Sequence, residues 1–140
     1  MAFSLIEILV AVVLLGIMFV SLYSGFSAGF AVMQLARENL RATQILQEKM
    51  ETIRLYTWDQ INTPGFIPTN FVESFYAVGT NGNSMNYTGT VRIAQAPVST
   101  PYSNELKQVK IVLEWVSADV LRSRQMQTYV TRHGLQNYIY

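Results

Sequence analysis

The 29 residues from Ile8 to Ala36 contain no Asp, Glu, Lys or Arg, and this stretch constrains the fold more than any other feature. The 140-residue chain has 10 Lys and Arg and 9 Asp and Glu, of which only Glu7 precedes Arg37. As an α-helix the stretch would be about 43 Å long, more than the roughly 30 Å of a bilayer's hydrocarbon core. Its first part, up to Val20, has no polar face of the kind that lies in a membrane surface. The chain is therefore not uniformly soluble.

Composition excludes several classes of function. Hydrophobic residues make up 50% of the chain and the net charge is only +1, which excludes intrinsic disorder and gives no basic surface for duplex nucleic acid. The absence of cysteine removes disulfides, thiol nucleophiles and cysteine zinc sites. His133 is the only histidine, and acidic side chains are too scarce near the C-terminus for a calcium loop. We therefore expect no enzymatic activity, no cofactor and no metal.

Glu7 lies immediately before the apolar stretch. A carboxylate inside a membrane segment costs roughly 2.5 to 3.5 kcal/mol, so such a residue is functional by default and needs a partner. The alternative is that Glu7 marks the boundary between membrane and water. Periodicity alone leaves both interpretations open.

The residues around Glu7 carry a resemblance to a known family. Residues 2–10 read AFSLIEILV and continue into the apolar stretch, which resembles the class III signal segment of type IV pilins and type II secretion pseudopilins over roughly the first 30 residues. The resemblance implies that a membrane peptidase cleaves between Ala2 and Phe3 and methylates the new amino terminus of Phe3. It also implies that Glu7 docks each subunit into a filament.

The chain departs from the family pattern at its beginning. Ala2 stands where Gly is usual before the cleavage site, and only Met1 and Ala2 precede Phe3 in place of a short basic leader. We expect either that a leader belongs ahead of this sequence or that Met1 and Ala2 remain on the mature protein.

Small residues mark a second segment of the helix. The family commonly has a Gly and, eight residues later, a Pro where the helix is weakened; here Gly16 fits the first position and Ser24 occupies the second. Gly25 and Gly29 form a G-x-x-x-G pattern in the same segment. These residues favour either close helix packing or local unwinding during assembly.

After the apolar stretch the pattern becomes amphipathic, and one helix is expected to continue until about residues 56–61, before the break at Thr63-Pro64-Gly65. Charged residues are expected elsewhere around this helix, namely Arg37, Glu38, Arg41, Glu48 and Glu51. The predicted apolar face consists of Met33, Ala36, Leu40, Thr43, Leu46, Met50 and Ile53.

The remainder of the chain predicts antiparallel strands. Segments 71–78 and 87–94 flank a turn-rich loop at 79–83, and a last strand runs from Val120 to about Arg132. Segment 106–117 alternates in polarity, with one apolar face made of Val109, Ile111, Leu113 and Trp115.

These elements predict an α+β, pilin-like fold. Residues 1–33 form the apolar transmembrane or filament-core half of a long helix, which protrudes. Residues 34–140 form a globular domain: helix at 34–60, loop at 61–70, small antiparallel sheet at 71–132 packed on the helix, and tail at 133–140.

The predicted function is that of a structural subunit: a single-pass inner-membrane protein that assembles with copies of itself into an extracellular helical filament. Its implied partners are the membrane, a prepilin peptidase and a pilus assembly machinery. The alternative is a pseudopilin or minor pilin of a secretion or DNA-uptake system, with a periplasm-spanning fibre. Lys110, Arg122, Arg124 and Arg132 could then contact DNA, although a charged strand face is usually solvated. A third possibility is a membrane-attached protein whose sheet binds a ligand.

Overall fold

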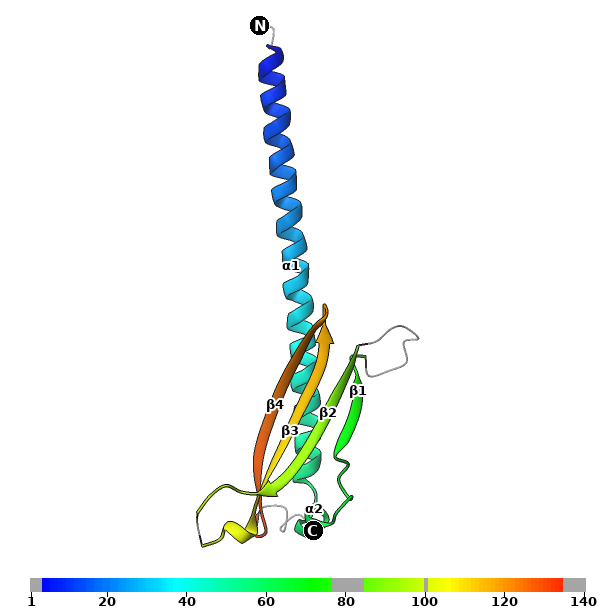
Figure 1. The fold of residues 1–140 in the computed structure, drawn as a ribbon, viewed down its shortest axis with the longest axis vertical. Helices are drawn as coiled ribbons and strands as arrows, with labels where there is room; N and C mark the ends of the chain where they lie inside the picture. Colours follow the sequence, from blue (N-terminus) through cyan, green and yellow to red (C-terminus); the bar gives the residue numbers. More distant parts are fainter. Residues whose placement is uncertain (1–3, 77–84, 100, 135–140) are drawn as a thin grey trace. The chain divides into compact units, whose positions relative to one another are not determined.

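The computed structural model of this chain describes residues 4–76, 85–99 and 101–134 (Figure 1). It divides into two compact units, which we call the N-terminal unit (Met1–Arg37) and the globular unit (Glu38–Tyr140). The elements are helix α1 (Leu5–Arg54), helix α2 (Trp58–Asn62), strand β1 (Asn70–Ser74), strand β2 (Asn86–Gln95), a short 3₁₀ helix (Ser103–Glu105), strand β3 (Leu106–Ser117) and strand β4 (Val120–Thr131). One long helix with an apolar N-terminal part and a four-stranded antiparallel sheet make this an α+β protein, as predicted.

Helix α1 ends earlier than the sequence pattern predicts. It stops at Arg54, and a new helix begins after Thr57, whose side chain accepts a hydrogen bond from the amide of Gln60 (3.4 Å). The Gln60 side chain accepts one from the Thr57 amide in return (2.9 Å). This reciprocal capping box provides acceptors for two amides at the start of α2, those of Thr57 and Gln60, and so favours two helices where one was expected.

The sheet is a meander in the order β1-β2-β3-β4, in which every neighbouring pair is antiparallel. Strand β3 has the predicted bounds, and β2 and β4 differ from the predicted ones by one residue at each end at most. Strand β1 ends at Ser74, earlier than predicted, and the predicted turn at 79–83 lies outside the described residues. The β3–β4 connection is a two-residue turn in which Ala118 (φ 48°) and Asp119 (φ 61°) are both left-handed.

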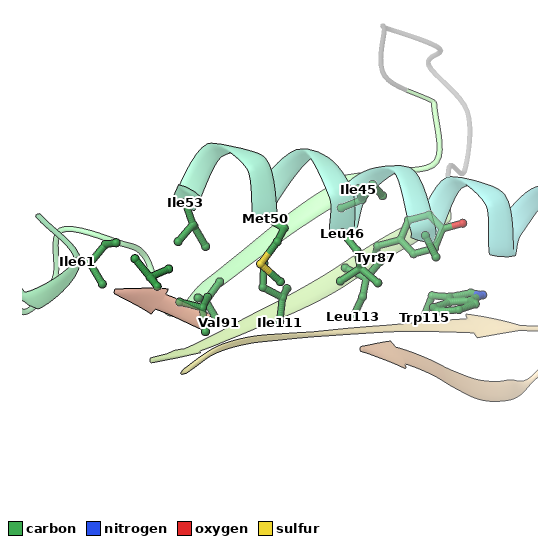
Figure 2. Close-up of a cluster of buried hydrophobic side chains, with 13 residues drawn as sticks. Ile45, Leu46, Met50, Ile53, Ile61, Tyr87, Val91, Ile111, Leu113 and Trp115 are labelled. Carbon is green, nitrogen blue, oxygen red and sulfur yellow. The ribbon is translucent and has the colours of Figure 1, made fainter. Parts of the chain in front are cut away.

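The core lies between one face of the sheet and residues 38–54 of α1, as Figure 2 shows for the labelled side chains. The predicted face of β3 is confirmed: Val109, Ile111, Leu113 and Trp115 are all buried, whereas Glu114 is exposed. They pack in one cluster with residues from α1, α2, β2 and β4, which are Ala42, Ile45, Leu46, Met50, Ile53, Ile61, Tyr87, Val91 and Val130.

The buried face of α1 was only partly predicted. Leu46, Met50 and Ile53 are buried as expected, but Leu40 is 61% exposed and Glu38 is 2% exposed. The buried positions within α1 are Glu38, Ala42, Ile45, Leu46, Met50 and Ile53. The prediction failed at Glu38 because a charged residue was expected away from the buried face, whereas contacts from Trp115 and Tyr87 of the sheet make its burial tolerable.

A close approach of β1 to β2 occurs at Gly89. This glycine is the register partner of Phe71, and a Cβ at Gly89 would overlap the Phe71 ring. The Lys49 ammonium lies 5.0 Å from the centre of that ring and 2.8 Å from a Glu73 carboxylate oxygen. The absent side chain thus leaves room for the Phe71 ring between Gly89 of β2 and Lys49 of α1.

Candidate functional site

The first turn of α1 is organised by Ser4. Its carbonyl accepts hydrogen bonds from the amides of Glu7 (3.0 Å) and Ile8 (3.3 Å), and its hydroxyl lies 3.4 Å from the Glu7 amide. Ser4 and Glu7 therefore have the S-x-x-E spacing of a capping box, and a carboxylate in the first turn interacts favourably with the helix dipole. Sequence reasoning missed this local role, which the spacing alone could have indicated.

Glu7 itself is exposed within the N-terminal unit. The positions three and four residues further along the helix, where a cation could pair with it, are Val10 and Ala11. No basic residue follows before Arg37. A charge partner for Glu7 therefore does not come from the neighbouring turns of α1.

The rest of this unit presents an apolar surface on all sides of the helix. Every residue from Ser4 to Gln34 is exposed, including Leu5 (82%) and Tyr23 (78%). A helix that is apolar all round is normally covered by protein or lipid. α1 is the one described helix that is long and apolar enough to cross a membrane, a property that signal sequences and soluble core helices share.

The small residues of α1 lie on an intact helix. The helix continues through Gly16, Ser24, Gly25 and Gly29, and each of these glycines has open space where a Cβ would be. A shallow apolar hollow on the helix surface is lined by Met18, Ser21, Leu22, Gly25 and Phe26. Such a hollow permits close approach of another helix. Unwinding during assembly stays a prediction.

The predicted cleavage and methylation positions, Ala2 and Phe3, lie outside the described residues. Of the site residues that the family resemblance implies, Glu7 and the small residues of α1 are therefore the ones with a described environment.

A buried polar cluster in the globular unit was not predicted. Glu38 accepts a hydrogen bond from Trp115 Nε1 at Oε2 (3.4 Å), and its backbone carbonyl accepts one from the Tyr87 hydroxyl (3.0 Å). The Tyr87 and Trp115 rings are 5.4 Å apart. Burial, and then the charge of Glu38, raises the pKa of Tyr87 to about 12. This cluster is closed to solvent, so it holds α1 on the sheet rather than acting on a substrate.

The basic residues considered for DNA contact do not share one surface. Arg122 and Arg124 are register partners of Trp115 and Leu113 and so lie on the side of β4 that faces α1, whereas Lys110 alternates to the opposite face of the sheet. The Arg124 guanidinium donates to the Asn39 carbonyl (2.9 Å) and to the Thr43 hydroxyl. Arg124 therefore joins β4 to α1 within the globular unit.

Arg132 lies near the other end of β4. Its backbone amide donates to the Glu105 carbonyl (2.9 Å), and the exposed His133 ring lies 3.7 Å from the same residue's carboxylate. Among the described residues, no group of three or more His, Asp or Glu side chains could hold a metal ion.

No family model, no curated protein and no solved structure matches this chain.

Proposed function

We propose that this chain is a structural subunit of a type IV pilus-like filament, anchored in a membrane by the N-terminal part of α1 and assembled through packing of these helices. One observation carries the proposal: the helix is apolar and exposed from Ser4 to Gln34, so something must cover it. The segment AFSLIEILV at residues 2–10 supports a pilin-like arrangement through its resemblance to that family.

Lipid covers the helix before assembly, and helices of other copies replace it in the filament. Removal of apolar surface from water is favourable by roughly 25 cal/mol per Å², which keeps these helices out of water in both states. Contacts between different surfaces of identical copies produce an open helical fibre when the rotation that relates one copy to the next does not close into a ring. The hollow beside Gly25 offers a place where a neighbouring helix can approach closely.

Glu7 has a specific role in this arrangement. In a filament core its carboxylate would be buried, which requires a positive partner, and removal of one member of a buried ion pair costs about 3 to 5 kcal/mol. The amino terminus of an adjacent copy supplies that charge. A prepilin peptidase creates this terminus at Phe3 by cleavage after Ala2, and a pilus assembly machinery extracts the subunit from the inner membrane to the cell surface.

Two variants with matched chemistry test the proposal. Glu7→Gln removes the charge but keeps a side chain that can complete the capping box with Ser4, since Gln and Glu both serve at that position. Glu48→Gln makes the same change at an exposed position of α1 in the globular unit. Both variants are expressed in the native host, and filaments are measured in sheared surface material by immunoblot and electron microscopy. Resistance to alkaline extraction measures membrane anchoring.

The proposal expects Glu7→Gln to remain in the membrane and to lose its filaments, while Glu48→Gln keeps both properties. Normal filaments from Glu7→Gln would refute the docking role of the charge. Release of the parent protein by alkaline extraction, without surface filaments, would refute the anchored subunit itself.

A further inference from the structure

The sheet has a second face, opposite to the core side chains of Figure 2, which we call the outer face. Side chains alternate along a strand, so Lys110, Val112 and Glu114 of β3 lie on this face, between the buried residues of the same strand. Their register partners on β2 and β4 lie on it as well. Within the described strands, no side chain of the outer face is buried. Its exposed large apolar residues are Val72, Val116, Leu121 and Tyr129.

Two cations lie side by side near the middle of the outer face. Arg92 on β2 and Lys110 on β3 are register partners. None of the ion pairs among the described residues includes either of these two side chains. Like charges directly opposite each other on neighbouring strands destabilise a sheet. An acidic group placed over this pair would relieve the repulsion.

The described strands carry one acidic residue on the outer face, Glu114. It is four residues from Lys110 on β3, or about 13 Å along the strand, which is too far for an ion pair within one copy. Val112 lies midway between the two. A twofold axis that runs across the strands at Val112 therefore exchanges the two positions. It lays Glu114 of a second copy over Lys110 of the first and beside Arg92, and the reverse pair forms at the same time.

The apolar residues of β4 obey the same symmetry. Gln125 is the register partner of Val112, and it lies midway between Leu121 and Tyr129. The axis at Val112 therefore brings the Tyr129 end of one outer face over the Leu121 end of the other. A surface that is complementary to itself in this way is what a twofold interface requires.

We propose that the outer face is a docking surface for a second copy of this chain, in a twofold dimer whose two sheets pack face to face with antiparallel strands. Two sheets that pack in this way keep their strands within about 30° of each other and lie about 10 Å apart. The contact is made by the globular unit alone, so the inference goes beyond the proposed filament and does not depend on it.

The size of the outer face sets the strength of the dimer. Strands β2, β3 and β4 are 10, 12 and 12 residues long. With a rise of about 3.3 Å per residue and a strand spacing of about 4.8 Å, they present roughly 500 Å² in projection. A stable interface buries about 800 Å² per partner, so the dimer is weak and forms at high protein concentration. Because its ion pairs lie at the surface, salt weakens it further.

The absence of cysteine from the sequence makes a crosslinking experiment direct. Val112→Cys places a thiol on the twofold axis, where it faces the same residue of the second copy, and a short bismaleimide can join the two. Gln47→Cys, at an exposed position of α1, is the control. The full chain is studied in detergent micelles at several protein and salt concentrations, and the crosslinked dimer is measured on denaturing gels. Lys110→Glu, Glu114→Lys and the double variant are each combined with Val112→Cys, and circular dichroism checks their fold.

The proposal expects a yield of crosslinked dimer at Val112→Cys several-fold above that at Gln47→Cys, decreasing with added salt and with dilution. Glu114→Lys should lower the yield several-fold because three cations then meet, and Lys110→Glu should lower it because two carboxylates meet. The double variant should restore most of it, since opposite charges face each other again. Equal yields at the two cysteine positions, or a double variant no better than Glu114→Lys, would overturn the dimer. A yield at Val112→Cys that does not change with salt would overturn the charge pairing without any reversed variant. The filament is tested separately by Glu7→Gln.

Discussion

Trp115 Nε1 and Glu38 Oε2 are 3.4 Å apart, and this contact joins β3 to the first residue of the globular unit. Glu38 is 2% exposed, and burial of a carboxylate is costly unless hydrogen-bond donors and charges compensate it. The Tyr87 hydroxyl binds the backbone carbonyl of the same residue from β2. Two strands therefore fix the position of α1 through one acidic residue.

Loss of the Trp115 donor should destabilise the globular unit. Trp115→Phe retains an aromatic ring but removes the indole N–H, and we expect the free energy of unfolding to fall by about 1 to 3 kcal/mol because a buried acceptor loses a partner. Urea unfolding of the full chain in detergent micelles, followed by circular dichroism, measures the change. Trp58→Phe, at a half-buried position in α2, is the control and should cost less. Equal costs in both variants would contradict the role of this contact.

Tyr87 should make the protein sensitive to alkaline pH. Its pKa is about 12 in the folded state and about 10 in the unfolded state, so the folded state binds the proton more tightly. The resulting stability is fully present below pH 10 and is lost as the pH rises from 10 towards 12, by about 2 to 3 kcal/mol in total.

The matched variant for this prediction is Tyr87→Phe, which cannot ionise at that position. Urea midpoints measured at pH 8 and pH 11 should differ more in the parent than in Tyr87→Phe. The other residues are the same in both proteins, so their contributions cancel in the comparison. An identical fall in both proteins would show that Tyr87 does not contribute.

Gly89→Ala should be destabilising through a clash rather than through backbone strain. The new Cβ would overlap the Phe71 ring, and relief requires the ring to move from its place below Lys49. Overpacking of this kind costs typically about 1 to 3 kcal/mol. A double-mutant cycle with Phe71→Leu checks the cause, because the effect of Gly89→Ala should be much smaller when the ring is absent. Additive effects of the two substitutions would exclude the clash.

Arg124 should contribute to the attachment of β4 to α1. Arg124→Gln shortens the side chain and removes the charged donor that reaches the Asn39 carbonyl and the Thr43 hydroxyl. Since this side chain is exposed, we expect a loss of only about 1 kcal/mol in the free energy of unfolding. Arg92→Gln, on the outer face of β2, should be near neutral in the same urea titration. The contact would be unimportant if the two variants had the same midpoint.

The local sequence pattern was sufficient to predict an element where its hydrogen bonds and packing neighbours follow a regular spacing along the chain. Strand β3 was predicted with its bounds and its buried face, because alternation from Val109 to Trp115 follows directly from the pleat. It was not sufficient at the end of α1, where the side chain of Thr57 starts a second helix within a segment of continuous helical pattern. The Ser4 cap shows the opposite case, since the spacing to Glu7 was present in the sequence and was overlooked.

The sequence by itself determined that a long apolar helix precedes an antiparallel sheet, since helix length and strand alternation depend on the order of residues alone. It also placed Glu7 and the small residues of α1 on that helix, where the proposed assembly surface lies. Only the tertiary structure decided that Glu38 is buried and Leu40 exposed, and that Arg122 and Arg124 lie on the side of β4 facing α1. Those choices depend on partners such as Trp115 and Tyr87, which are distant in the sequence and can compensate a buried charge only once the sheet has folded against the helix.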